Sequence, residues 1–336
     1  MESLLLLPIA LSFILIMVAL PKWIRKCHHI GLLWEDMNKF NHPKNVAASG
    51  GIVVVFAFVF GVLAYIALRT FVFQIDSVNV KIFSLLNVVL ILGMIGLTDD
   101  LLGWKHGGLS VNFRIIFAFL ASIPLVVINA GTSAVNVPFF GLVDLGILYP
   151  LLIIPIGVAG ATTTYNMLAG FNGLETGLGI IIISFLSYVA FITGNSWLSV
   201  IGLCMVAALC GFFIFNKVPA KVFPGDILTY SIGAMIAGMA ILGNFEKIAV
   251  FVFIPFILET FLKSRGRLKK QSFGIPNEDN SLELPYPKLY GMTHVSLFIL
   301  KKFKKKVYEN DVVYFLFAFE IVLCVLALLI FRGGLV

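Results

Sequence analysis

Charged residues are scarce in this sequence. Only 12% of its 336 residues are Asp, Glu, Lys or Arg, whereas 60% are hydrophobic. Soluble domains contain about 25% charged and about 45–50% apolar residues, so this composition excludes an ordinary water-soluble protein. The chain also lacks internal repeats, low-complexity tracts and Ser/Pro-rich linkers. We therefore expect residues 1–336 to form a single integral membrane domain.

The sequence also shows no spacing typical of a metal site and no pattern typical of a cleavable leader. The four cysteines, like the five histidines, show no spacing typical of a metal site. Three of the cysteines lie in apolar runs, which indicates small buried hydrophobes. No basic residue precedes the first apolar run, as it would in a secretory signal peptide. This pattern favours a retained first helix.

Long apolar runs are what the sequence has in abundance. A membrane-spanning helix needs about 20 mostly apolar residues. Windows of this kind predict an all-α polytopic membrane protein with about ten transmembrane helices. They cover residues 3–21, 50–68, 82–98, 113–129, 146–163, 176–193, 197–215, 228–243, 247–262 and 313–331.

The basic residues predict the orientation of these spans. Of 24 Lys and Arg residues, all but Arg69, Lys81, Lys247 and Arg332 fall in alternate connections. Basic connections stay in the cytoplasm, so we expect the N-terminus outside and the polar connections facing the cytoplasm. Topology thereby accounts for the net charge of +7, and no nucleic acid partner is expected.

Polar residues of three cytoplasmic connections suggest chemistry. Asp99 and Asp100 end an apolar run, where a carboxylate costs about 2.5–3.5 kcal/mol on insertion scales. They either cap a loop and pair with Lys105, or hold a divalent cation against phosphate. The stretch YNMLAGFNGLETG (165–177) offers two asparagines, whose amides suit a metal or a base. Asp226 follows a Pro-Gly turn in VFPGD, where an N-cap is the simpler interpretation.

The loop at 263–312 carries a basic cluster after the ninth span. Lys263, Arg265, Arg267, Lys269 and Lys270 either anchor the loop in the cytoplasm or cover a phosphorylated ligand. The following residues predict a short hairpin and then an interfacial helix near 289–300. Polar connections of this kind, without a transmembrane charge ladder, favour metal and phosphate chemistry over ion transport.

Three motifs in this order carry a family resemblance. LTDDLLGW, NMLAGFNGLETG and VFPGDILTYSIG resemble the polyprenyl-phosphate N-acetylhexosamine-1-phosphate transferases. The NGLE form at 172–175 is typical of the eukaryotic and archaeal branch, the UDP-GlcNAc–dolichyl-phosphate GlcNAc-1-phosphate transferases. The likeness extends from about residue 36 to 300, and the family architecture has ten spans.

The resemblance implies a reaction and its participants. A polyprenyl phosphate, here dolichyl phosphate, attacks the β-phosphorus of UDP-GlcNAc and releases UMP, the first step of N-glycan precursor assembly. Mg²⁺, or alternatively Mn²⁺, is the implied cofactor. The resemblance also implies an archaeal plasma membrane rather than the endoplasmic reticulum, and a homodimer is a further expectation.

The resemblance also assigns residue roles. The implied catalytic carboxylates are Asp99 and Asp100, and the implied metal ligands are Asn166 and Asp226. Where family members have an Arg-His-Arg run, this chain has KSRGRLKKQSFGIP, which leaves Arg265, Arg267 and Lys269 as approximate replacements. The implied substrate contacts are these three residues, the uracil-binding Asn172 and Phe223, the pyrophosphate-binding Lys105 and His106, and Glu175 and Gly225 of the motifs.

Two alternatives remain at this point. A bacterial-type transferase would act on undecaprenyl phosphate, although the NGLE form argues against it. A secondary transporter would use Asp99, Asp100 and Asp226 to bind ions, although no inverted repeat is present. Ala48 stands where family members often have an acidic residue that contacts the sugar, so the choice of hexosamine stays open.

Overall fold

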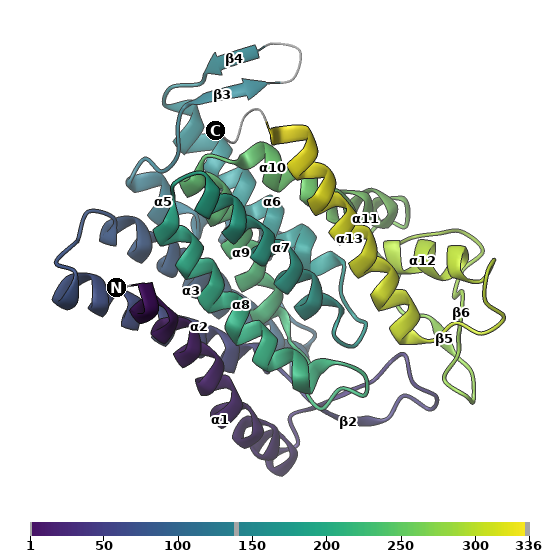
Figure 1. Ribbon diagram of the computed structural model, residues 1–336. Helices are drawn as coiled ribbons and strands as arrows, with labels where there is room; N and C mark the ends of the chain where they lie inside the picture. Colours follow the sequence, from purple (N-terminus) through teal and green to yellow (C-terminus); the bar gives the residue numbers. More distant parts are fainter. Residues whose placement is uncertain (1, 138–140, 333–336) are drawn as a thin grey trace.

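The computed structural model describes residues 2–137 and 141–332, without the side chains of 2–3, 105–106, 135–137 and 141–142. Its described part is a bundle of helices (Figure 1). Within these described residues, seven helices are long and apolar enough to cross a membrane. They are α1 (Leu6–Ile30), α2 (Gly51–Ala67, extended by a π-helical turn to Val72), α3 (Asn79–His106), α7 (Leu174–Ile192), α8 (Ser196–Asn216), α9 (Asp226–Gly243) and α13 (Glu309–Phe331).

The other three predicted spans are interrupted helices. The span at 113–129 is divided into α4 (Val111–Leu120) and α5 (Ile123–Val127), and that at 247–262 into α10 (Glu246–Val252) and α11 (Ile254–Arg265). The third consists of a π-helical turn followed by α6 (Ile154–Met167). Proline lies in the first turn of α5, α6 and α11, where its missing N–H ends the preceding helix. A polytopic helical protein is confirmed, whereas the count of ten spans is not.

Three two-stranded hairpins lie outside the bundle. Strands β1 (Leu33–Glu35) and β2 (Lys44–Ala47) pair antiparallel, as do β5 (Ile275–Pro276) and β6 (Leu282–Glu283). The second of these hairpins and α12 (Met292–Leu300) confirm the hairpin and the helix predicted within 263–312, whereas the interfacial position of that helix stays a prediction. The hairpin of β3 (Ala134–Val137) and β4 (Gly141–Asp144) was not predicted. Figure 1 shows β3–β4 at the opposite end of the bundle from β2, β5 and β6.

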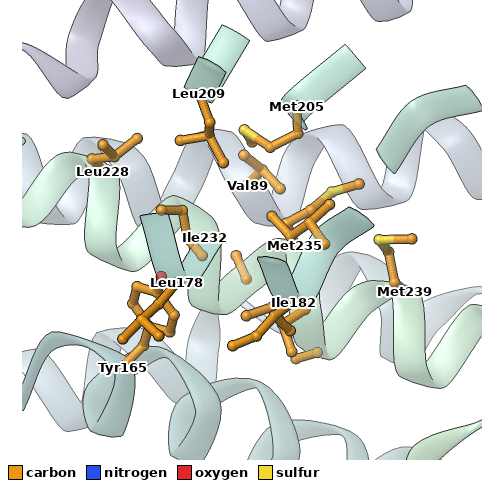
Figure 2. Packing of buried hydrophobic residues seen from close by; sticks show 14 of the residues in the cluster. Val89, Tyr165, Leu178, Ile182, Met205, Leu209, Leu228, Ile232, Met235 and Met239 are labelled. Atoms are coloured by element: carbon orange, nitrogen blue, oxygen red, sulfur yellow. The ribbon is translucent and has the colours of Figure 1, made fainter. Parts of the chain in front are cut away.

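Helix α9 forms the centre of the core. Every residue from Ile227 to Gly243 is buried, and α3, α6, α7 and α8 pack against it. Figure 2 shows Leu228, Ile232, Met235 and Met239 of α9 among side chains of these neighbours. Because its residues are mostly small or apolar, α9 accepts neighbours on all sides. Its first residue, Asp226, is thereby held where the ends of α3 and α6 meet.

Candidate active site

A cavity of about 380 Å³ lies among these helix ends. The first loop, the ends of α3 and α6, the start of α7 and the segment before α9 all contribute to its wall. Eight of the predicted site residues line it: Asp99, Asp100, Asn166, Asn172, Glu175, Phe223, Gly225 and Asp226. Motifs far apart in the sequence therefore meet at one place.

Asp99 is held by an arginine that the sequence analysis did not single out. Its Oδ1 accepts a hydrogen bond from the Leu109 N–H at 2.5 Å. Its Oδ2 lies 3.1 Å from Nη1 of Arg114, and the same nitrogen lies 3.8 Å from Oδ2 of Asp226. Asp99 is only 5% exposed, and Arg114 is the cation beside it. Arg114 thus joins two of the predicted carboxylates.

Asp100 contacts the backbone at the start of α9. Its Oδ1 accepts from the N–H of Asp226 at 2.7 Å, and its Oδ2 accepts from that of Ile227 at 3.4 Å. A carboxylate at a helix N-terminus satisfies free N–H groups and complements the helix dipole. Gly225, with φ of 72°, makes this approach possible, because a Cβ there would lie 2.2 Å from Asp100 Oδ2. Asp100 therefore positions Asp226.

Asp226 and Asn166 share a threonine neighbour. Thr229 Oγ1 lies 3.1 Å from Asn166 Oδ1 and 3.2 Å from the carbonyl oxygen of Asp226. The Asp226 side chain is 28% exposed, so its carboxylate is accessible from the cavity it lines. Carboxylate and amide oxygens are ligands that Mg²⁺ accepts. The donor set at the start of α9 and the end of α6 thus fits a hard cation.

The first loop is joined to the segment that carries Phe223. The Phe223 N–H donates to the Ala47 carbonyl at 2.8 Å, and the Gly50 N–H donates to the Phe223 carbonyl at 2.9 Å. This pairing continues β2 beside residues 222–224. It places Ala48 and Phe223 in the wall of the same cavity.

The NGLE loop is fixed by acidic side chains. Glu175 is 5% exposed, and its Oε1 accepts from the Gly170 N–H at 2.7 Å. The Asn172 N–H donates to Oε1 of Glu309 at 2.7 Å. Glu309 is the first residue of α13, and Lys39 of the first loop forms an ion pair with it. The last helix of the chain therefore contacts the site directly.

The basic loop cluster lies elsewhere. Arg265, Arg267 and Lys269 are exposed and are not among the residues that line the cavity, so we expect them to attract the ligand at long range, and their predicted contact with pyrophosphate is left to experiment. Lys263 is the member that reaches the site, because its Nζ donates to the carbonyl of Met167 at 2.6 Å. Met167 is the neighbour of Asn166 in the chain.

Two predicted basic residues fall outside the description. The side chains of Lys105 and His106 lie in the part that the structure does not describe. The preceding residue, Trp104, lines the main cavity and a second one of about 210 Å³, which Trp34 and Lys44 also line. No described lining residue of the main cavity is Lys, Arg or His.

Sequence reasoning missed the roles of three residues, two of which carry a recognisable signal. Arg114 is a cation at the start of an apolar stretch, and Glu309 is a carboxylate at the start of the last span. Lys263 was grouped with its exposed neighbours, although it is the one closest to the apolar helix. Charge at the edge of a membrane segment usually has a function, and this rule would have identified Arg114 and Glu309.

Metal ligation by protein groups alone is limited. Within residues 2–137 and 141–332, no three His, Cys, Asp or Glu side chains form a group that could hold a metal ion. Magnesium sites commonly use one or two carboxylates and complete their coordination with water and substrate phosphates. The cavity fits that type of site better than a closed protein cage.

Comparison with known proteins gives consistent matches. The model for "Glycosyl transferase family 4" matches residues 82–244. A protein of Sulfolobus acidocaldarius with the provisional name UDP-N-acetylglucosamine–dolichyl-phosphate N-acetylglucosaminephosphotransferase is 32% identical, over 96% of this chain and 94% of its own length. A protein of Saccharolobus solfataricus with the same provisional name is 33% identical, over 97% and 96%.

A bacterial relative extends the comparison. The phospho-N-acetylmuramoyl-pentapeptide-transferase of Streptococcus thermophilus is 29% identical, over 74% of this chain and 75% of its own length. The two archaeal proteins cover nearly the whole chain at higher identity. These matches confirm the predicted resemblance, including its likeness to archaeal members. The chain belongs to glycosyl transferase family 4.

Proposed function

We propose that this protein transfers GlcNAc-1-phosphate from UDP-GlcNAc to dolichyl phosphate and releases UMP. The observation that carries the proposal is the convergence of Asp99, Asn166 and Asp226 on one cavity, in a chain that is similar over nearly its whole length to proteins named for this reaction. The reaction would begin the assembly of an N-glycan lipid precursor.

The main obstacle to this reaction is electrostatic. A phosphate monoester and a pyrophosphate, both anionic, must approach each other, so catalysis depends on neutralising and positioning them. A bound Mg²⁺, or Mn²⁺ in its place, would supply positive charge between the phosphates. Asp226 and Asn166 are the proposed ligands, because carboxylate and amide oxygens fit a hard cation and both residues line the cavity.

The other residues of the site would orient the reactants. Arg114 lies 3.1 Å from Asp99, which fixes the direction of that carboxylate, and it would add positive charge behind the cavity wall. Asp99 either receives the proton of the lipid phosphate or orients the cation. Phe223 would stack on the uracil ring, and Asn172 would bind its edge.

One assay separates the competing functions. The purified protein is given UDP-GlcNAc and dolichyl or undecaprenyl phosphate, and UMP release and product mass are measured. We expect UMP and a polyprenyl-pyrophosphoryl-GlcNAc product, with dolichyl phosphate as the better acceptor. EDTA should stop the reaction and added Mg²⁺ should restore it.

Three other outcomes would change the proposal. Better use of undecaprenyl phosphate would favour the bacterial-type alternative. Release of no UMP, together with uptake of an ion into proteoliposomes, would favour a transporter. Full activity in chelated enzyme would remove the cation from the mechanism. A panel of UDP-hexosamines tests the sugar, for which Ala48 leaves the choice open.

The proposed location follows from topology. Archaeal relatives and seven apolar helices support the plasma membrane of an archaeon. The distribution of basic residues supports a cavity that faces the cytoplasm, where UDP-sugars are made. A homodimer stays a prediction.

A further inference from the structure

The side-chain amide of Asn172 is held by two carboxylates from distant parts of the chain. Its Nδ2 lies 2.9 Å from Oδ2 of Asp36 and 3.3 Å from Oε2 of Glu309. All three residues are at least 95% buried. Ionised carboxylates only accept hydrogen bonds, so the donating nitrogen of the amide must lie on their side.

The carboxylate of Glu309 is held by several partners in this position. Lys39 forms an ion pair with Oε2, and Asn38 Nδ2 lies 3.3 Å from Oε1. The same Asn38 nitrogen donates to the carbonyl of Gly170 at 2.9 Å. One carboxylate thus ties the first loop, the NGLE loop and α13 together, which leaves Asn172 a single orientation.

The opposite atom of the amide is left for a ligand. Asn172 lines the cavity, and its Oδ1 accepts no hydrogen bond from the described residues, whereas its N–H and Nδ2 are both engaged. An oriented carbonyl oxygen requires a donor from whatever binds there. It would be matched by an N–H on the edge of a base.

We propose that Glu309, together with Asp36, is a positioning residue that turns Oδ1 of Asn172 into the cavity and so selects uridine over cytidine nucleotides. The inference rests on the proposed function. Uracil carries a hydrogen on N3 and donates it to Oδ1, whereas N3 of cytosine is a bare acceptor. Cytosine would therefore place two acceptors face to face, with neither satisfied, and a site built for a donor rejects such a ligand.

The test reverses the direction of these hydrogen bonds without changing shape. In Asp36→Asn/Glu309→Gln, two amide nitrogens can donate to Asn172, so its amide can rotate and present Nδ2 to the base. We measure kcat/KM for UDP-GlcNAc and for CDP-GlcNAc in wild type, both single variants and the double variant. The ratio of UDP to CDP should fall by about 10- to 100-fold in the double variant, which corresponds to one mispaired buried hydrogen bond.

The single variants separate positioning from folding. Each should lower the ratio part of the way and raise KM for UDP-GlcNAc more than it lowers kcat, because base contacts are similar in the ground and transition states. Glu283→Gln is the matched control, since Glu283 forms an exposed ion pair with Lys301 and its loss should leave the ratio unchanged.

The outcomes keep the two proposals apart. If wild-type protein releases no UMP from UDP-GlcNAc, the proposed function fails, and binding of UMP against CMP still tests the role of Glu309. If wild type is active and the single variants keep its ratio and KM, the inference is overturned, whether or not the double variant can be purified.

Discussion

At the residue scale, the three aspartates of the site have different partners. Asp99 is paired with Arg114, Asp100 accepts backbone N–H groups of α9, and Asp226 keeps an accessible carboxylate. Asp99 and Asp100, although adjacent in the sequence, therefore have different roles. Asp100 acts on the site through the position of Asp226, whereas Asp226 has a partly exposed carboxylate beside Arg114 and is the proposed cation ligand.

Asp226→Asn should lower kcat by at least about 10-fold, equivalent to about 1.4 kcal/mol of transition-state stabilisation. The amide keeps the shape of the side chain but loses the charge that the cation needs. Steady-state UMP release measures the effect, and thermal stability in detergent serves as the folding control. A variant that keeps more than about a tenth of wild-type activity would show that Asp226 is not a metal ligand.

Arg114→Gln should lower kcat/KM by about 10- to 100-fold, the value of one charge-assisted hydrogen bond. The change leaves buried Asp99 without its cation and removes positive charge beside Asp226. Arg114→Lys is the matched variant. It keeps the charge but not the fork geometry, and it should recover part of the loss. Equal activity of the two variants would mean that the charge at this position does not matter.

The sequence predicted the residues that lie within motifs better than those that act across the fold. Asp99, Asn166 and Asp226 each end or begin an apolar run, and the cavity brings them together. The roles of Arg114 and Glu309 depend on partners 15 and 137 residues away, respectively, at Asp99 and Asn172. No local pattern contains such pairings, because helix packing alone creates them.

At the element scale, α11 connects the basic loop to the end of α6. Lys263 donates to the carbonyl of Met167, and its ammonium lies 3.5 Å from Oε1 of Glu259. Glu259 is fully buried, and its Oε2 accepts from the N–H of Met292 at the start of α12 at 2.5 Å. This chain of contacts joins α6, α11 and α12.

Lys263→Met should destabilise the protein by about 3 kcal/mol, because it leaves the buried carboxylate of Glu259 unpaired. It should also lower activity, since the end of α6 loses an anchor next to Asn166. Thermal inactivation rates measure the first effect and UMP release the second. The double change Lys263→Met/Glu259→Gln should recover stability but not activity. Recovery of both would mean that Lys263 only neutralises Glu259.

Neutralising the exposed cluster, with Arg265, Arg267 and Lys269 changed to Gln, should have a smaller effect than Arg114→Gln. These side chains are exposed and outside the cavity wall, so we expect long-range attraction rather than contact. Exposed charges are screened by salt over about 10 Å at 0.1 M. Activity should fall less than about tenfold and the loss should shrink as salt rises. A salt-independent loss of two orders of magnitude would instead indicate direct contact with pyrophosphate.

Interrupted helices limited what the sequence could predict about elements. The hydropathy of residues 113–129 and 247–262 resembles that of a continuous span. The breaks at Ser122 and Phe253 arise beside Pro124 and Pro255. Apolar composition does not show where a helix is interrupted. The available signal of an interruption was a proline near the middle of each window.

At the scale of the whole molecule, the three hairpins lie at the two opposite ends of the bundle. Residues of β1, β2 and the β5–β6 loop belong to the end with the cavity, and β3–β4 lies at the other (Figure 1). The predicted orientation assigns the first end to the cytoplasm. The bias of basic residues toward that end supports this assignment.

Single cysteines should be labelled from opposite sides of intact membranes. Lys302 lies in the basic loop, whereas Asp76 lies in the α2–α3 connection, and both are exposed. A membrane-impermeant maleimide should label Asp76→Cys in intact cells and Lys302→Cys only in inside-out vesicles. A background without Cys27, Cys204, Cys210 and Cys324 serves as the control. Labelling of both sites from one side would refute the predicted topology.

The burial of α9 also bears on how the protein is made. This helix has the lowest mean hydropathy of the seven and is almost wholly enclosed, and most of the helices that pack against it (α2, α3, α6, α7 and α8) leave the ribosome before it. Its glycines allow close packing against helices that are already folded, since a Cβ at Gly233 would lie 2.6 Å from the Thr162 backbone. Lipid is a poorer environment for Asp226, Thr229 and Ser231 than the assembled bundle. Biogenesis of this enzyme should therefore depend on earlier helices receiving α9 as it leaves the translocon.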